Sequence, residues 1–259
     1  FGLDIINSLP KGVGTTIIKH ANPSGVSINK KQLLSFKYAF NCDPISAFGG
    51  VIICNYKINS ETAKEISKKF FEVVVANDFE NKALSILKRK KNLRIIKNNQ
   101  KYDNSEIVFN TLSKNIILQN SDNGSFNKRN FKIVSKSKPS KKMLNDLIFA
   151  FNICRFVKSN AIVLTNNNST VGIGSGQPSR LDSCEIAVNK MKKFNHNTEN
   201  LVAASDAFFP FVDGIELLVQ SGVRAIIQPY GSIRDKEVIK FVNNTNAVLV
   251  FSKTRHFRH

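Results

Sequence analysis

The most reactive pair of side chains in this sequence is a lysine followed directly by a histidine, Lys19 and His20. An ammonium group can polarise an oxygen, and an imidazole takes up or releases a proton near neutral pH. The pair follows an apolar run that predicts a buried strand, and α/β sheets bind ligands at the carboxyl ends of strands. Lys19–Gly25 is therefore a candidate acid–base loop. A lone histidine is more often structural, however, and Asn22–Gly25 alone could form a turn.

Three further segments contain small or aromatic residues that suit a ligand. Asp43–Gly50 has the small residues that a close approach of backbone to ligand needs, but it also fits a tight helix-to-strand connection. Gly172–Arg180 resembles a phosphate-cradling loop, although it matches neither the G-x-G-x-x-G nor the Walker A pattern. Ser205–Phe211 places three phenylalanines around a proline, which could stack on a flat ring or pack in the core. Each segment alone leaves ligand binding and a structural role open.

Strand and helix patterns alternate along the chain, which predicts an α/β protein with a largely parallel or mixed sheet. Apolar runs predict strands at residues 15–18, 51–54, 73–76, 161–164, 170–173, 201–204, 223–228 and 247–251. Helical spacing links Leu33 to Phe40, Ala63 to Phe70, Leu144 to Phe151, residues around Ile186, and Ile215 to Val219. Ser60 and Ser232 are predicted helix caps, and Gly222 suits a helix C-terminus.

The same rhythm divides the chain into two α/β units, residues 1–135 and 136–259. The polar segment 97–142 interrupts the alternation, so we expect a linker or irregular region there. With 259 residues and 42% apolar content, the chain can bury a large core. No apolar run approaches the roughly 18 residues that a membrane span needs.

The cysteine pattern argues against a disulfide framework or a zinc site, because the four cysteines form no C-x-x-C pair. A reducing cytoplasm is the simplest location. The first residue is Phe1 rather than methionine, so we expect the chain to be a piece of a longer protein.

The net charge of +19 could attract a polyanion, and residues 82–142 carry +13 of it, with 16 basic and three acidic residues. This stretch includes the run Lys88–Lys91. It lacks the interleaved aromatic residues of a base-stacking surface and any known nucleic-acid module. A solvated surface is the first interpretation, attraction of anionic small molecules the second, and nucleic-acid binding the third.

Taken together, the four candidate segments are similar to those of one family. From Thr15 to His259 the chain resembles AICAR transformylase, the formyltransferase part of a bifunctional purine biosynthesis protein whose other part is IMP cyclohydrolase. The match includes residues 225–235, AIIQPYGSIRD, and the terminal sequence RHFRH at 255–259.

The resemblance implies transfer of a formyl group from 10-formyltetrahydrofolate to the weakly nucleophilic exocyclic amine of AICAR. His20 would take the proton of the attacking amine. Lys19 would polarise the formyl oxygen or help a proton to the folate leaving nitrogen. Asn160 would hydrogen-bond the formyl group and its developing oxyanion.

The resemblance also implies two sets of binding residues. AICAR would contact Phe48, Gly49, Phe208 and Arg255. Folate would contact Arg180, Leu181, Pro210, Phe211 and Asp213. Glu72 falls where the family often has another acidic residue.

The family's fold resembles two cytidine deaminase-like α/β units with mixed sheets flanked by helices, in agreement with the two units above. Deamination does not follow, because the chain has neither H-x-E nor C-x-x-C to hold zinc. We therefore expect no catalytic metal, while a structural monovalent cation stays open. The resemblance further implies a cytoplasmic homodimer whose active site draws on both subunits, with no nucleic acid or membrane partner.

The chain departs from the family at its start. The cyclohydrolase domain and the R-Y-G-x-N-P-H-Q segment that helps to hold the AICAR phosphate are absent from it. Two competing interpretations are a basic nucleic-acid-binding protein and a catalytically silent fragment that retains folate contacts.

Overall fold

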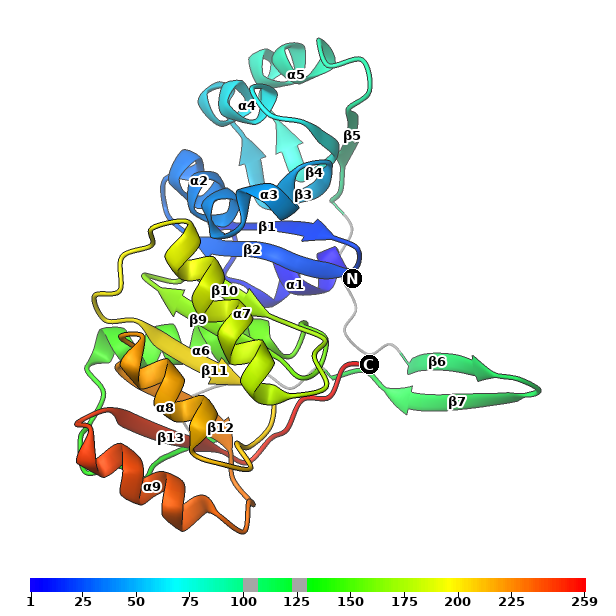
Figure 1. The fold of residues 1–259 in the computed structure, drawn as a ribbon. Helices are drawn as coiled ribbons and strands as arrows, with labels where there is room; N and C mark the ends of the chain where they lie inside the picture. Colours follow the sequence, from blue (N-terminus) through cyan, green and yellow to red (C-terminus); the bar gives the residue numbers. More distant parts are fainter. Residues whose placement is uncertain (100–106, 123–129) are drawn as a thin grey trace.

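The computed structural model of the chain describes residues 1–99, 107–122 and 130–259, in which one large mixed sheet is flanked by helices (Figure 1). The sheet has eleven strands in the order β5-β4-β3-β1-β2-β10-β9-β11-β12-β13-β8. The α/β class and the mixed sheet are confirmed. No helix in the described ranges is long and apolar enough to cross a membrane.

The first half of the sheet is built from residues 2–97. Its elements are α1 (Gly2–Ser8), β1 (Gly14–Lys19), β2 (Asn22–Ile28), α2 (Gln32–Cys42), α3 (Pro44–Ala47), β3 (Gly50–Ile58), α4 (Ser60–Ser67), β4 (Phe71–Phe79), α5 (Asn81–Lys88) and β5 (Arg94–Lys97). β1 is antiparallel to β2 and β3, whereas β3, β4 and β5 run parallel.

The second half repeats this topology. Its elements are α6 (Lys141–Cys154), β9 (Ile162–Asn166), β10 (Ser169–Gly174), α7 (Arg180–Lys193), β11 (Val202–Ser205), α8 (Asp213–Gln220), β12 (Ala225–Pro229), α9 (Asp235–Asn244) and β13 (Val248–Ser252). β9 is antiparallel to β10 and β11, and β11, β12 and β13 are parallel. The boundary at 135/136 and the likeness to cytidine deaminase stay predictions.

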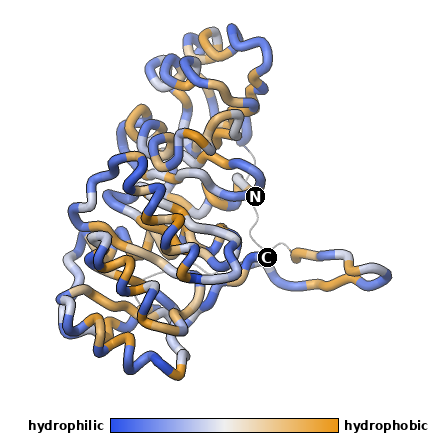
Figure 2. Tube along the Cα trace, in the orientation of Figure 1, coloured by the Kyte–Doolittle hydropathy of each residue, from blue (hydrophilic) through white to orange (hydrophobic). Residues whose placement is uncertain are grey.

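The two halves join edge to edge through β2 and β10, which run antiparallel. The Ser27 and Ser169 hydroxyls lie 2.7 Å apart across the joint, and the Thr170 hydroxyl accepts a hydrogen bond from the Val26 amide at 2.9 Å. One face of the sheet packs on α1 and α6, and the other on α2, α4, α5, α7, α8 and α9. The hydropathy colouring of Figure 2 shows apolar residues along the central strands.

The segment 97–142 is only partly irregular in its described residues. It contains a hairpin of β6 (Ile107–Leu112) and β7 (Asn115–Asn120), and β8 (Phe131–Ile133) adds an edge strand beside β13. An irregular linker is therefore wrong for these three strands, which are rich in the β-branched and aromatic residues typical of strands. Residues 100–106 and 123–129 lie outside the described part.

Lys19–Gly25 is not a loop along its whole length, which corrects the prediction. Only His20 and Ala21 form a turn, with φ of 49° and 55°, and Asn22 already begins β2. Pro23 and Gly25 look like strand breakers in the sequence. Gly25 is needed for packing instead, because a Cβ there would lie 1.8 Å from the Ala39 carbonyl oxygen of α2.

Smaller corrections concern helix ends. The side chain that caps α4 is Asn59 rather than Ser60, and Phe70 lies beyond the end of that helix. α9 begins at Asp235 with Arg234 at its N-cap position, two residues later than the predicted cap Ser232. The helix α1 had no predicted counterpart.

Candidate functional site

One edge of the sheet collects all four candidate segments. Lys19 pairs with Asn22 across the β1–β2 hairpin, and the neighbouring Ile18 pairs with Val51 at the start of β3. In the other half, Ile162 pairs with both Gly174 and Ser205. Because β2 and β10 are antiparallel, these ends lie on the same side of the sheet, which we call the site edge.

The parallel strands reach the site edge with opposite ends in the two halves of the sheet. Carboxyl ends of parallel strands form it in the second half, as expected for an α/β sheet. Lys19 instead lies beside the amino ends of β3 and β4, because β1 is antiparallel to β3. The rule that α/β sheets bind ligands at the carboxyl ends of their parallel strands therefore does not explain the position of the Lys19–His20 pair.

The Lys19 ammonium group is held by backbone oxygens of the next candidate segment. Its Nζ donates hydrogen bonds to the carbonyls of Phe48 at 3.0 Å and Gly49 at 3.1 Å. Gly49 has φ of +66°, and a Cβ there would lie 3.1 Å from the Lys19 Nζ, so the position requires glycine. The neighbouring His20 side chain is exposed at the tip of its turn.

Phe48 and Phe70 form an aromatic pair beside this turn. Their ring centroids lie 5.0 Å apart, and Phe48 is 64% exposed. The Gly49 amide donates to the Phe70 carbonyl oxygen at 2.9 Å, which fixes the segment against the start of β4. An exposed ring held in this way can stack against a flat ligand. Glu72, two residues after Phe70, is exposed near the start of β4.

A cavity of about 170 Å³ lies between the His20 turn and the second half of the sheet, and its lining includes Lys19, His20, Asp43, Ser175 and Lys190. Asp43 is buried and pairs with Lys190 of α7 at 2.8 Å. Burial alone would raise the pKa of Asp43, but hydrogen bonds from Lys190 and Ser46 outweigh it and leave the pKa below its usual value. The ionised carboxylate thus ties the two halves together.

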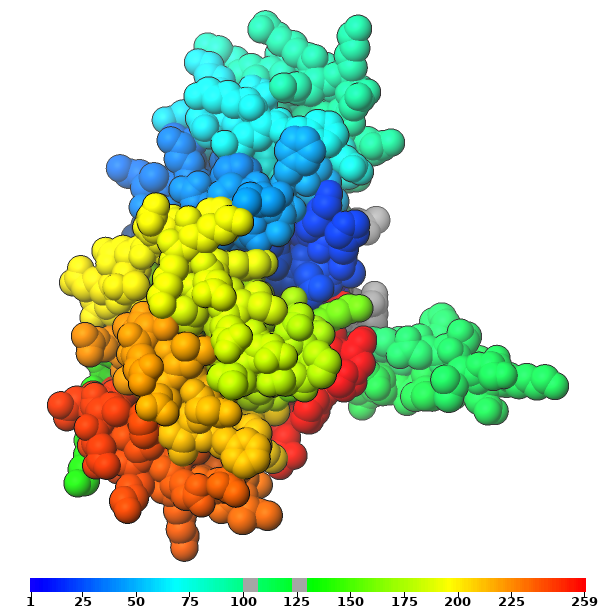
Figure 3. Space-filling view, viewed as in Figure 1, coloured from blue at the N-terminus to red at the C-terminus, as the bar shows by residue number. Residues whose placement is uncertain are grey.

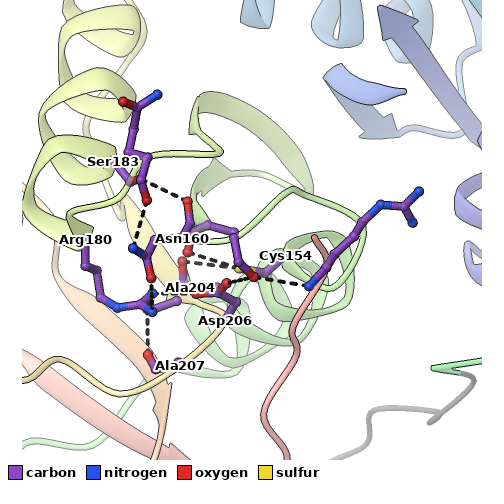
Figure 4. A network of polar contacts seen from close by, with 12 residues as sticks. Cys154, Asn160, Arg180, Ser183, Ala204, Asp206 and Ala207 are labelled. Atoms are coloured by element: carbon purple, nitrogen blue, oxygen red, sulfur yellow. Dashed lines mark hydrogen bonds and ion pairs between the residues drawn. The ribbon is translucent and has the colours of Figure 1, made fainter. Parts of the chain in front are cut away.

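A polar network in the second half surrounds Asn160 (Figure 4). Its Nδ2 donates to the carbonyls of Gln177 and Pro178, both at 2.9 Å, and its Oδ1 accepts from the Arg180 Nη2 at 2.7 Å. Both amide hydrogens and the amide oxygen of Asn160 are therefore engaged within the chain.

Arg180 and Asp206 form the buried centre of this network. Arg180 donates to the Asp206 carboxylate and to the Ser205 hydroxyl, and Ser159 donates to the other carboxylate oxygen at 2.7 Å. The side chains of Arg180 and Asp206 are only 8% and 1% exposed. The guanidinium group of Arg180 thus positions Asn160, and three of its five N–H donors are used within the chain.

The glycines of Gly172–Arg180 have a packing role. A Cβ at Gly172 would lie 2.2 Å from the Ala187 oxygen, and one at Gly174 would lie 1.8 Å from the Ser183 oxygen. Both oxygens belong to α7, so the glycines let this helix lie against β10. The glycine-rich sequence that resembles a phosphate-cradling loop is therefore explained by the packing of α7 on β10.

The aromatic segment Ser205–Phe211 divides between core and surface. Phe209 is buried, whereas Phe211 is 52% exposed with the Arg234 guanidinium 4.8 Å from its ring centre. The Arg255 guanidinium lies 5.0 Å from the ring centre of the half-buried Phe208. Pro210 and Asp213 are exposed nearby, and Leu181 is half-buried in the first turn of α7.

The C-terminal tail passes along the Asn160 network. The His256 amide donates to the Asp206 carbonyl at 3.0 Å, and the Ser159 amide donates to the Arg258 carbonyl at 2.9 Å. The His256 Nδ1 lies 2.5 Å from the Asp122 carboxylate. Asp122 and Lys190 are neighbours of the candidate site that sequence reasoning missed, because nothing in their spacing links them to it.

Within the described ranges, no three His, Cys, Asp or Glu side chains are placed to hold a metal ion. The four cysteines are buried, free thiols. Burial raises the pKa of Cys42 to about 12 and that of Cys54 to about 11, so both stay protonated at neutral pH.

The fold and the site edge define the class of this protein. It is a two-part α/β protein with a single shared sheet. One edge of that sheet carries a lysine–histidine pair in the first half and arginines beside aromatic rings in the second. The model of the AICARFT/IMPCHase bienzyme family matches residues 2–190, and the chain belongs to this family. This confirms the resemblance drawn from the motifs.

Relatives named bifunctional purine biosynthesis protein PurH match almost the whole chain. The protein of Leptospira biflexa serovar Patoc is 44% identical over 98% of this chain and 50% of its own length. That of Buchnera aphidicola subsp. Schizaphis graminum is 45% identical over 94% and 47%. That of Aquifex aeolicus is 40% identical over 98% and 50%. The chain spans about half the length of the curated relatives that it matches.

Proposed function

We propose that this chain is the formyltransferase part of a bifunctional purine biosynthesis enzyme and transfers the formyl group of 10-formyltetrahydrofolate to AICAR. Family membership supports this assignment. The observation that carries it is the exposed His20 beside a Lys19 whose ammonium group is held by the carbonyls of Phe48 and Gly49. The other half of the relatives' length would hold IMP cyclohydrolase.

The first half would supply the proton chemistry. An ammonium group has three N–H donors, and Lys19 uses two of them on backbone carbonyls, so one is left for the formyl oxygen or the folate nitrogen. The exposed imidazole of His20 would accept the proton of the attacking amine. Phe48 would pack on the AICAR ring, with the Gly49 backbone beside it.

The second half would supply recognition. Arg255, an exposed cation beside Phe208, would hold the nucleotide phosphate. Leu181, Pro210, Phe211 and Asp213 would line the folate site, and Arg180 would shape it through Asp206. Asn160 would donate to the oxyanion by exchanging one of its two backbone acceptors for substrate.

No proposed step uses a metal ion. The structural monovalent cation that the resemblance leaves open would play no part in the chemistry. We place the enzyme in the cytoplasm as a homodimer whose active site draws on both subunits. AICAR and folate are its proposed small-molecule partners.

The test is formyl transfer followed by the absorbance of tetrahydrofolate, for this chain and for His20→Ala. We expect a loss of about a hundredfold or more, the usual effect of removing an acid–base group, and partial recovery when imidazole is added. The control is His196→Ala, which removes a histidine that has no part in the proposed chemistry. Equal activity of His20→Ala and the unchanged chain would refute the role of His20.

The competing interpretations respond differently. A silent fragment predicts no activity here but activity in a chain extended at its N-terminus. A nucleic-acid binder predicts affinity for a DNA duplex that falls steeply with salt and with charge reversal of Lys88–Lys91, and that ignores His20→Ala.

A further inference from the structure

A cavity of about 400 Å³ lies between α9 and the strands β13 and β8, and its lining includes Tyr230, Asp235, Ile239 and Phe251. We call it the α9 cavity. α9 and the loop before it form one end of the molecule, drawn at the bottom of Figure 3. A volume of this size is within the range of small-molecule sites. None of the residues proposed above to contact AICAR or folate lines it.

The walls of the α9 cavity are largely apolar and partly aromatic. Phe251 of β13 is buried, Ile239 of α9 is half-buried, and the Tyr230 side chain is 51% exposed. Aromatic rings pack best against other flat rings, either offset-stacked or edge to face. Two such rings beside one cavity therefore favour a flat ligand, and the volume accommodates a two-ring base together with its sugar.

Asp235, the first residue of α9, brings an unsatisfied hydrogen-bond acceptor to this cavity. Its Oδ2 accepts a hydrogen bond from the Gly231 amide at 2.8 Å. Its Oδ1 is buried and has no hydrogen-bond partner in the described part of the chain. A buried polar atom without a partner costs free energy, and more so when it is charged. The cavity is therefore completed by a ligand that donates an N–H group to this oxygen.

A second buried side chain at the same strand end also lacks partners. Gln228 pairs with Phe251 across β12 and β13 and is 0% exposed, and neither its Nε2 nor its Oε1 is hydrogen-bonded within the described residues. Buried polar groups in folded proteins are nearly always hydrogen-bonded. Gln228 and Asp235 together leave three polar atoms unpaired where β12 leads into α9, so the chain alone does not complete this region.

Two exposed lysines, Lys132 and Lys253, add positive charge to the lining. Lys132 pairs with Phe251 across β8 and β13, so its side chain leaves the sheet on the same face as that ring. Neither lysine forms an ion pair with an acidic group of the described residues. A phosphate monoester fits two ammonium groups, because it carries about two negative charges near neutral pH.

We propose that the α9 cavity binds an aminopurine nucleoside monophosphate. The base would pack against Tyr230 and Phe251, and its amino group would donate to the Asp235 Oδ1. The phosphate would contact Lys132 and Lys253. This site goes beyond the proposed formyl transfer and does not depend on it. Binding measured without folate therefore tests the cavity alone, and its failure leaves the proposed activity untouched.

The first experiment measures the binding of AMP to the unchanged chain by equilibrium dialysis at constant ionic strength. We expect a dissociation constant of about 10–100 μM, ordinary for a ligand of this size. Purine riboside 5′-monophosphate lacks only the amino group, and adenosine lacks only the phosphate. Each should bind about tenfold more weakly than AMP, because each loses one charge-assisted contact. Absence of AMP binding, or equal affinity for all three compounds, would overturn the proposal.

The second experiment assigns the binding to the cavity with variants. Asp235→Asn can still accept the Gly231 amide but loses the second acceptor, so its affinities for AMP and for purine riboside 5′-monophosphate should become equal.

Charge is tested with two lysine pairs. Lys132→Gln/Lys253→Gln should weaken AMP binding about tenfold. The matched control Lys236→Gln/Lys240→Gln removes the same charge from exposed positions of α9 that do not line the cavity, and should change binding by no more than about twofold. Circular dichroism checks that every variant folds.

Phe48→Ala, at the proposed AICAR contact, should leave the affinity for AMP unchanged. Loss of AMP binding in Phe48→Ala would show that AMP occupies the proposed substrate site, and equal effects of the two lysine pairs would show only general attraction to a basic chain. Either result would overturn the assignment of the α9 cavity.

Discussion

Replacing Arg180 by methionine tests whether the buried ion pair with Asp206 holds the second half of the site together. The guanidinium contacts Asp206, Ser205 and Asn160 at once, and its removal leaves a carboxylate that is 1% exposed with Ser159 as its remaining side-chain partner. A buried ion pair broken on one side costs about 3–5 kcal/mol, because the remaining charge is uncompensated. We expect Arg180→Met to lower the free energy of unfolding by that amount.

Two companion variants separate charge from geometry. Arg180→Lys keeps the charge but cannot bridge Asp206 and Asn160 together, so we expect a loss of about 2 kcal/mol. Arg180→Met combined with Asp206→Asn removes both charges and should be less destabilised than the sum of the single changes. A coupling of about 2 kcal/mol or more in this double-mutant cycle would show that the two groups stabilise each other directly.

The assay is urea unfolding followed by circular dichroism, since the chain has no tryptophan. Arg234→Met is the matched control, because Arg234 pairs with Glu237 while both side chains are about half exposed. Such a surface pair contributes about 0.5 kcal/mol. If Arg180→Met costs no more than Arg234→Met, the Arg180–Asp206 pair is not the structural centre of the site.

Two further outcomes can be checked by the same unfolding measurements. Gly25→Ala should cost about 3 kcal/mol, because the new Cβ would meet the Ala39 oxygen at 1.8 Å, whereas Gly12→Ala should cost only about 1 kcal/mol for its φ of +80° in open space. Asp43→Asn should cost about 1–2 kcal/mol at neutral pH by removing the bond to Lys190. Because the pKa of Asp43 is lowered from 3.8, its stabilisation is present above pH 3.8 and is lost as the pH falls through the lower folded value. The difference between wild type and Asp43→Asn should therefore shrink in acid, and a constant difference would contradict the ionised pair.

The sequence predicted the parts of the fold that depend on local apolar patterns. The strands around Val51 and Val163, for example, bury side chains on both faces, and their apolar runs show it directly. Strand β2 was missed because Pro23 and Gly25 interrupt its pattern, and the reason for Gly25 is a contact with a helix that the sequence does not place.

The candidate site shows the same limit. The segments around Lys19, Asp43 and Gly172 could be selected from residue types alone, whereas Asn160 was indicated only by the family resemblance. Their convergence on one edge depends on the antiparallel joint between β2 and β10, which no local pattern specifies. The engagement of Arg180 by Asp206 was likewise invisible, since an arginine in a glycine-rich segment looks the same whether it binds a ligand or a buried carboxylate.

Because the topology repeats, the His20 turn can be compared with the equivalent turn of the second half. The equivalent turn of the second half, between β9 and β10, is formed by Asn167 and Asn168, both with φ of 53°. Asparagine and histidine are both enriched in this left-handed conformation, while alanine holds it at a higher conformational energy. Strain of this kind is often found at functional sites. The first half therefore keeps an unfavourable residue, Ala21, next to its proposed acid–base group, His20.

This comparison predicts a trade between stability and activity at the turn. Ala21→Gly should raise the free energy of unfolding by about 1 kcal/mol, because glycine adopts φ of 55° without strain. Asn168→Ala in the equivalent turn should lower it by about the same amount. His20→Asn should leave the stability almost unchanged and abolish the proposed formyl transfer, since asparagine also suits the turn but cannot accept the proton. Urea unfolding and the formyl-transfer assay measure the two effects separately. A destabilised Ala21→Gly, or an active His20→Asn, would show that the turn is not held in strain for the sake of the imidazole.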